Sequence, residues 1–249
     1  MGKVLPALVV FTLLPGWVGP TWAQEKARRI LEKAVKAQGG EANIAKRNVM
    51  RVKLKGKVTI PNLGEQEVII EDTWQMPGQY KHVMETEVNG KKARQTFVVN
   101  GNQGWGSLNG QTQAMTDKEL AEFLEEKYGE DLDRLGFLKE KGHKLTVLKE
   151  IKINGRPAVG VEVEAKLHRA VKLYFDKATG ILVKRERQVP GNTGKLATQE
   201  AFFSDYKAQD GVPHWRKIVA KLGSKQFIEA KVTEIKFFKK LENKVVAKF

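Results

Sequence analysis

The stretch MRVKLKGKVTI, residues 50–60, decides the fold class. Its apolar side chains stand at residues 50, 52, 54, 58 and 60, and basic residues or threonine stand between most of them. Because side chains of a β-strand point alternately to the two faces of a sheet, this period of two is typical of a strand. The stretch therefore predicts a strand with one buried face and one basic, solvated face.

Similar alternation continues on both sides of short turns. Pro61-Asn62-Leu63-Gly64 and Pro77-Gly78 end two runs, and Asn-Gly dipeptides, which favour tight hairpin turns, recur at residues 89–90, 100–101, 109–110 and 154–155. Further strands are expected at residues 145–153, 158–166, 171–175, 181–189, 197–206, 215–222 and 227–237. Hairpin connections of this kind indicate an antiparallel meander of roughly a dozen strands, a mainly β (α+β) fold. A sheet of that size is expected to curl as its twist accumulates.

Two segments have helical periodicity instead. Residues 27–35 carry apolar side chains at helical spacing and precede Gly39-Gly40, which predicts an N-terminal helix. Thr116 and Glu119 match a capping box at the start of a second helix, expected over residues 117–135. Its apolar face includes Leu120, Phe123, Leu124 and Tyr128, which we interpret as the inner face of a lid over the sheet.

The N-terminus has the organisation of a cleavable secretory signal. Lys3 precedes an apolar run, residues 4–18, and Thr21-Trp22-Ala23 forms a small-residue cleavage site before Gln24. A membrane-spanning helix is the alternative, but the run is short and is interrupted by Pro6 and Pro15. We expect residues 1–23 to be a signal peptide, residues 24–249 to form a single domain, and the protein to be exported, to the periplasm or otherwise outside the cell.

Composition limits the chemistry. The chain has no cysteine, which excludes disulfides, thiolate metal sites and a cysteine-linked lipid anchor. Its four histidines are scattered and no enzyme motif is present, so the sequence predicts neither an enzyme nor a metal or other cofactor. Asp72 is the one carboxylate on the apolar side of a predicted strand, and a lysine is its expected partner.

The formal net charge is +15. Two interpretations stay open: lysines that keep the outer side of the strands soluble, or a surface for an acidic partner. Without a nucleic-acid-binding motif, an anionic membrane surface is the better candidate for such a partner than a nucleic acid.

Two turn signatures resemble the LolA/LolB-like family of exported lipoprotein carriers. Residues 174–180, YFDKATG, match a strand followed by an Asp-x-x-Thr-Gly turn, and Asp205-Tyr206 precedes Asp210-Gly211-Val212-Pro213, with a shortened approach to the proline. The resemblance spans essentially the whole mature chain, although both signatures are turn chemistry that other meander proteins use. It implies an unclosed, curved antiparallel β-barrel whose concave apolar side is covered by helices.

The same resemblance implies a function as a carrier of lipids or lipoproteins. The apolar face of the sheet then forms a cavity for acyl chains, with a predicted lining of Met50, Leu54, Trp74, Met84, Phe97 and Trp105. A closed core without a ligand is the alternative for these side chains, and an exported sensor or scaffold that binds a partner protein is the alternative function. Leu63, at the tip of its turn, is a candidate membrane contact, or else folds back under the turn. The protein is expected to be a monomer.

Overall fold

The computed structural model describes residues 22–88, 90–140, 142–191 and 194–242. The first half of the chain forms an antiparallel meander. Its strands are β1 (Val49–Ile60), β2 (Gly64–Gln75), β3 (Gln79–Val88), β4 (Lys91–Asn100), β5 (Gln103–Leu108) and β6 (Gln111–Ala114). Each strand pairs with the next, so the predicted hairpins are confirmed.

The second half forms another meander. Its strands are β7 (Lys144–Ile153), β8 (Arg156–Ala165), β9 (His168–Asp176), β10 (Leu182–Pro190), β11 (Leu196–Ser204), β14 (Lys217–Leu222) and β15 (Lys225–Phe237). A short hairpin of β12 (Lys207–Gln209) and β13 (Val212–His214) lies between β11 and β14 in the chain. β15 pairs with β1, with Met50 opposite Phe237, and this pairing joins the two meanders.

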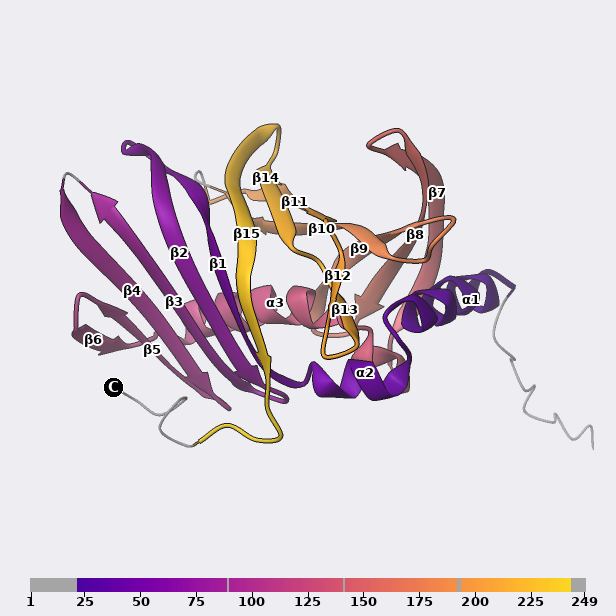
Figure 1. Ribbon diagram of the computed structural model, residues 1–249, viewed down its shortest axis with the longest axis horizontal. Coiled ribbons are helices and arrows are strands. Elements are labelled where there is room, and N and C mark those ends of the chain that lie inside the picture. Colours follow the sequence, from indigo (N-terminus) through magenta and orange to yellow (C-terminus); the bar gives the residue numbers. More distant parts are fainter. Residues whose placement is uncertain (1–21, 89, 141, 192–193, 243–249) are drawn as a thin grey trace, which may run out of the picture.

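The result is one sheet of 13 strands in the order β6-β5-β4-β3-β2-β1-β15-β14-β11-β10-β9-β8-β7 (Figure 1). β6 and β7 lie at opposite edges and do not pair, so the curved sheet is an unclosed barrel. The mainly β architecture expected from the sequence, a curved and unclosed antiparallel sheet, is confirmed.

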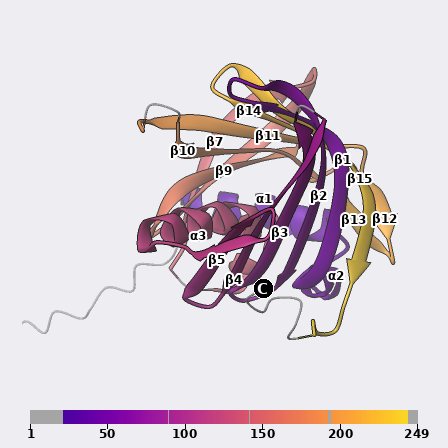
Figure 2. The same ribbon diagram turned by 90° about the vertical axis from the view of Figure 1, so that its left-hand side faces the viewer.

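The helices are α1 (Trp22–Ala37), α2 (Glu41–Lys46), α3 (Asp117–Leu132) and a 3₁₀ turn, η1 (Gly136–Lys139). α3 and η1 connect β6 to β7, which are consecutive in the chain but lie at opposite edges of the sheet. A connection between the two edges has to cross the open side of the barrel. Figure 2 shows α3 inside the curve of the sheet, so topology explains why this helix covers the concave face.

Two apolar clusters fill the concave side. The larger packs α1, α2 and η1 on β7–β11 and includes Leu31, Ile44, Leu132, Leu173 and Phe175. The smaller is formed by β1, β2 and β15, around Met50, Leu54 and Ile70. The alternating pattern of residues 50–60 therefore buries its apolar face as predicted.

The lid helix is shorter than predicted. The capping box of Thr116 and Glu119 is present at its start, but α3 ends at Leu132 rather than near Leu135. The amides of residues 133–135 bond to carbonyls three rather than four positions back, and Leu135, with a left-handed φ of 61°, then turns the chain out of the helical direction. The leucine periodicity continues through residue 135 because Leu132 and Leu135 both enter the larger core cluster, one from the helix and one from the turn after it.

Residues 1–21 of the predicted signal segment lie outside the described residues. Its last two residues, Trp22 and Ala23, are the first residues of α1. Among the helices in the described ranges, none combines the length and the apolar composition needed to cross a membrane.

Gly56 is a position where the sheet tolerates no side chain. A Cβ built there lies 2.1 Å from the Glu229 carbonyl oxygen and 2.5 Å from the Ala230 Cα of the neighbouring β15. Gly56→Ala should therefore force β1 and β15 apart and lower the free energy of unfolding by about 2 kcal/mol, measured by urea denaturation. Gly136→Ala, where a Cβ meets nothing within 4 Å, is the matched control. Equal losses in the two variants would contradict the close approach of the strands.

Candidate ligand-binding cavity

Between α3 and the sheet lies an outer cavity of about 510 Å³. Its apolar wall combines side chains from five strands with one residue of the helix and one of the loop before it: Phe97, Met115, Phe123, Val171, Val189, Leu222 and Phe227. Phe123 of α3 and Phe97 of β4 face one another, with ring centroids 5.9 Å apart. The volume lies in the range of small-molecule binding sites in proteins.

An inner cavity of about 200 Å³ adjoins it. The two cavities share Glu126, Arg187, Gln199 and Phe227. One wall of the inner cavity is apolar and comes mainly from the smaller core cluster and the strands beside it: Val52, Leu54, Ile70, Trp74, Phe203, Trp215, Ile218 and Ile228. Each cavity thus has an apolar wall, and the lining of the outer one also includes charged residues of α3 and of the sheet: Glu119, Glu122, Glu125, Glu126, Arg169 and Arg187.

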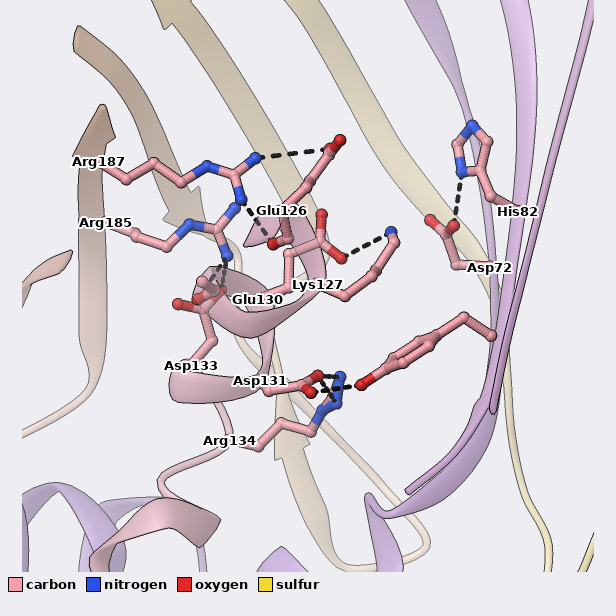
Figure 3. Close-up of polar contacts among 12 residues, drawn as sticks. Asp72, His82, Glu126, Lys127, Glu130, Asp131, Asp133, Arg134, Arg185 and Arg187 are labelled. Atoms are coloured by element: carbon pink, nitrogen blue, oxygen red, sulfur yellow. Dashed lines mark hydrogen bonds and ion pairs between the residues drawn. The ribbon is translucent and has the colours of Figure 1, made fainter. Parts of the chain in front are cut away.

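The opposite wall of the inner cavity is charged (Figure 3). Arg185 Nη1 of β10 donates to Asp133 Oδ2 at the end of α3, and both side chains are buried. Lys127 Nζ lies 2.9 Å from Glu130 Oε2, and Arg134 pairs with Asp131. Ion pairs and hydrogen bonds thus line the inward side of the second half of α3.

These pairs connect α3 to both walls of the sheet. From one side, Arg187 Nη1 donates to the Glu126 carbonyl oxygen at 2.6 Å. From the other side, Tyr80 Oη donates to Asp131 Oδ2 at 2.5 Å. Gly129 makes room for the arginine, because a Cβ there lies 3.0 Å from Arg187 Nη1. The second half of α3 is therefore fixed in place more firmly than its exposed start.

The charged wall shifts the pKa values of two carboxyl groups, Glu130 and Asp133, in opposite directions. Burial raises the pKa of Glu130, but the cations of Lys127, Arg185 and Arg187 outweigh it and lower the pKa to about 2. For Asp133, burial is the larger effect, and it raises the pKa to about 6 in spite of Arg185. The charged wall therefore contains one firmly ionised carboxylate and one that gains a proton in mildly acidic solution.

Asp72 lies on the inner face of β2, as predicted, but its hydrogen-bond partner is a histidine rather than a lysine. His82 Nδ1 of β3 lies 2.7 Å from Asp72 Oδ1, in register across the strand pair. Burial lowers the pKa of His82, but the adjacent Asp72 carboxylate outweighs it and raises the pKa overall. No cluster of metal-ligating side chains occurs in the part of the chain that the structure describes.

Comparison with known proteins gives a match at the level of fold. A LolA superfamily protein from Nitrosomonas europaea has a TM-score of 0.57 and 13% identity, over 89% of this chain and 97% of that chain. The chain has the LolA-like fold. A domain from Vibrio parahaemolyticus, assigned as an outer membrane lipoprotein-sorting protein, gives a TM-score of 0.54 and 15% identity, over 88% and 96% of the two chains.

A DUF1329 family protein from Desulfovibrio piger gives a TM-score of 0.55 and 12% identity, over 89% of this chain and 99% of that chain. No protein-family model matches the sequence, and no curated protein matches it. At these identities the LolA-like match concerns the fold alone, so the function has to be argued from the cavity.

The LolA-like sheet brings some of the predicted cavity residues together. Leu54 and Trp74 line the inner cavity, and Phe97 lines the outer one. Met50 is fully buried in the smaller core cluster, and Met84 packs against that cluster without lining either cavity.

Trp105 is placed differently. It pairs with Val98 across β4 and β5, whereas Phe97 pairs with Gly106. Neighbouring residues of a strand point to opposite faces, so Trp105 lies on the face opposite the cavity.

The predicted lid residues divide among several surroundings. Phe123 lines the outer cavity, and Leu120 packs near Met115 and Gly104. Tyr128 stacks on His168 with ring centroids 3.7 Å apart and packs against the larger core cluster. Leu124 lines neither cavity.

The helix thus has an apolar side against the core, but its cavity side is charged, which its leucine pattern did not predict. Three further residues of the inner cavity, Phe203, Trp215 and Phe227, were not predicted. The strands that carry them were expected, but the sequence did not show which of their side chains point inward.

Proposed function

We propose that the protein is an exported carrier that holds the acyl chain of a lipid or lipoprotein in the joined outer and inner cavities. The observation that carries this proposal is the two adjoining cavities between α3 and the sheet, which share Phe227 and Gln199 and each have an apolar wall. An acyl chain needs an elongated apolar space and few polar partners, and burial of each methylene contributes about 0.8 kcal/mol. The lipoprotein-sorting assignment of a protein with the same fold supports this choice of ligand.

A fluorescent fatty acid tests the proposal. Titrated into lipid-free protein below its micelle concentration, it should accept energy from Trp74 and Trp215, both of which line the inner cavity, and saturate at one molecule per chain. Gln113→Trp, at an exposed residue that lines the outer cavity and pairs with Gly106 on the same face as Phe97, should block binding without loss of stability. Absence of binding by the parent protein would leave the alternative of a protein-binding scaffold on the same fold.

Export is part of the same proposal. The predicted signal, residues 1–23, would deliver the chain to the periplasm. N-terminal sequencing of the exported protein should begin at Gln24; a sequence beginning at Met1 would contradict the predicted cleavage.

We infer that the first turn of α3, residues 117–121, acts as the movable part of the lid. These residues are largely exposed, whereas Glu122 and Glu125 pair with β9 and the second half of the helix is held by buried ion pairs. Opening of this turn should cost less free energy than global unfolding. Hydrogen exchange should be faster there than in β1 and should slow when a fatty acid binds. Protection equal to that of β1, with and without the fatty acid, would contradict a movable lid.

Leu63 is the proposed contact with an anionic membrane. It is 43% exposed in the turn between β1 and β2, so it does not fold back under the turn. Leu63→Glu should weaken binding to phosphatidylglycerol vesicles about tenfold without a change in thermal stability. Leu108→Glu, at a leucine of β5 that is 57% exposed, is the matched control. Equal vesicle binding by the parent protein and Leu63→Glu would remove the proposed contact.

A further inference from the structure

Arg47, the residue that caps the end of α2, places a buried cation at the inner cavity. The residue is 5% exposed. Its Nη1 donates to Gln38 Oε1, a neutral amide oxygen, and its Nε has no hydrogen-bond partner among the described residues. No described carboxylate lies within ion-pair distance of Arg47.

The other four cations of the inner cavity each have a carboxylate partner. Lys127 pairs with Glu130, Arg134 with Asp131, Arg185 with Asp133, and Arg187 with Glu126. Among the residues that line this cavity, the fifth cation, Arg47, is the one left without a carboxylate.

A buried guanidinium without an anion is costly, because burial removes its hydration and the neutral Gln38 amide leaves its charge unbalanced. The electrostatics of the surroundings agree with this imbalance. Burial lowers the pKa of Arg47 to about 10, although the carboxylate of Asp133 acts in the opposite direction. His214, which lines the same cavity, has its pKa lowered to about 3 by burial and by the positive charge of Arg47, so it stays neutral. The region around Arg47 is therefore deficient in negative charge.

We propose that Arg47 binds the anionic head group, a carboxylate or phosphate, of a single-chain amphiphile that enters the barrel head first. This inference rests on the proposed carrier function and specifies its ligand. The oxyanion pairs with the Arg47 guanidinium beside Trp74, which lines the same cavity and donates its own Nε1 hydrogen to the Arg47 carbonyl oxygen. The acyl chain follows the apolar wall of Leu54, Ile70 and Ile228 past Phe227 into the outer cavity.

Three ligands with the same acyl chain test the assignment: palmitate, methyl palmitate and palmitoyl lysophosphatidic acid, each titrated into lipid-free full-length mature protein. Both anions should bind at least tenfold more tightly than the uncharged ester. The tighter of the two anions identifies a fatty acid or a phospholipid as the source of the head group. Equal affinity for palmitate and methyl palmitate overturns the head-first assignment but leaves the carrier function standing. If none of the three ligands binds, both the carrier function and this inference fail.

Arg47→Met supplies the second comparison. It should bind methyl palmitate as tightly as the parent protein does and should lose the tenfold preference for palmitate. Arg94→Met removes a cation that is 60% exposed on β4, outside both cavities, and should keep the preference. A preference for palmitate that survives in a folded Arg47→Met protein would overturn the role of Arg47. If that variant does not fold, the comparison of acid and ester in the parent protein decides.

Discussion

Replacing Arg185 by methionine should lower the free energy of unfolding by about 3 kcal/mol at pH 7. Arg185 and Asp133 form an ion pair whose side chains are 6% and 9% exposed. The substitution leaves the Asp133 carboxylate buried without its cation, and its Oδ1 already lacks a hydrogen-bond partner among the described residues. Chemical denaturation followed by circular dichroism measures the loss.

The loss should be smaller at pH 5 than at pH 7. Burial raises the pKa of Asp133 to about 6 in the folded protein, above its value in the unfolded chain, and removal of Arg185 raises it further. At a pH between the unfolded and the folded pKa of Asp133, the folded protein therefore holds a proton on this carboxyl group that the unfolded chain does not bind. Stability from this group is present at low pH and is lost as the pH rises through the folded-state pKa.

A double variant serves as the control. Arg185→Met combined with Asp133→Leu removes both charges and replaces them with apolar groups, which should recover most of the lost stability. A single variant as stable as the parent at pH 7, or a double variant no more stable than the single one, would contradict a buried pair that fixes α3 to β10.

Trp74→Ala should cost about 3 kcal/mol, at the lower end of the range for removing a buried tryptophan ring. The ring packs against the smaller core cluster, donates from Nε1 to the Arg47 carbonyl oxygen at 2.8 Å, and lies 4.4 Å from the Arg134 guanidinium. Its remaining surface faces the inner cavity, so the loss of stability should be accompanied by weaker binding of a fatty acid. Urea denaturation and fluorescence titration measure the two effects separately.

Two further variants make the Trp74 result specific. Trp74→Phe keeps an aromatic ring but loses the hydrogen bond, and should cost about 1 kcal/mol. Trp105→Ala removes a tryptophan from the opposite face of the sheet and should leave fatty-acid affinity unchanged. A fatty-acid affinity that falls for Trp105→Ala but not for Trp74→Ala would mean that the ligand does not occupy the inner cavity.

Hairpin chemistry and the period-two pattern predicted most strands of the sheet, because local turns and alternation are properties of short segments. The same two rules also show on which face of the sheet Trp105 lies. Phe97 and Trp105 stand on either side of the two-residue turn at Gly101. Across such a turn, each odd-numbered residue pairs with an even-numbered one, and paired residues share a face. Two odd-numbered residues on either side of that turn therefore point to opposite faces. The sequence prediction nevertheless placed both in the cavity lining.

The charged wall of the inner cavity was not predictable in the same way. Residues 184–187 of β10 read Lys-Arg-Glu-Arg, so alternation cannot show which pair points inward. Tertiary structure decides: Arg185 and Arg187 face α3, while Lys184 pairs with Glu200 on the other face. The pairing of β1 with β15, which lie far apart in the sequence, likewise depends on long-range contacts that no local pattern contains.

Organic extraction of the protein purified from the exported fraction, followed by mass spectrometry, tests the central claim most directly. We expect about one acyl-chain amphiphile per chain, carrying a carboxylate or phosphate, and far less from the Gln113→Trp variant, whose new side chain fills the outer cavity. No acyl lipid in the extract, together with no uptake of fatty acid or lysophospholipid by the same protein, would contradict the claim that this LolA-like barrel is a carrier.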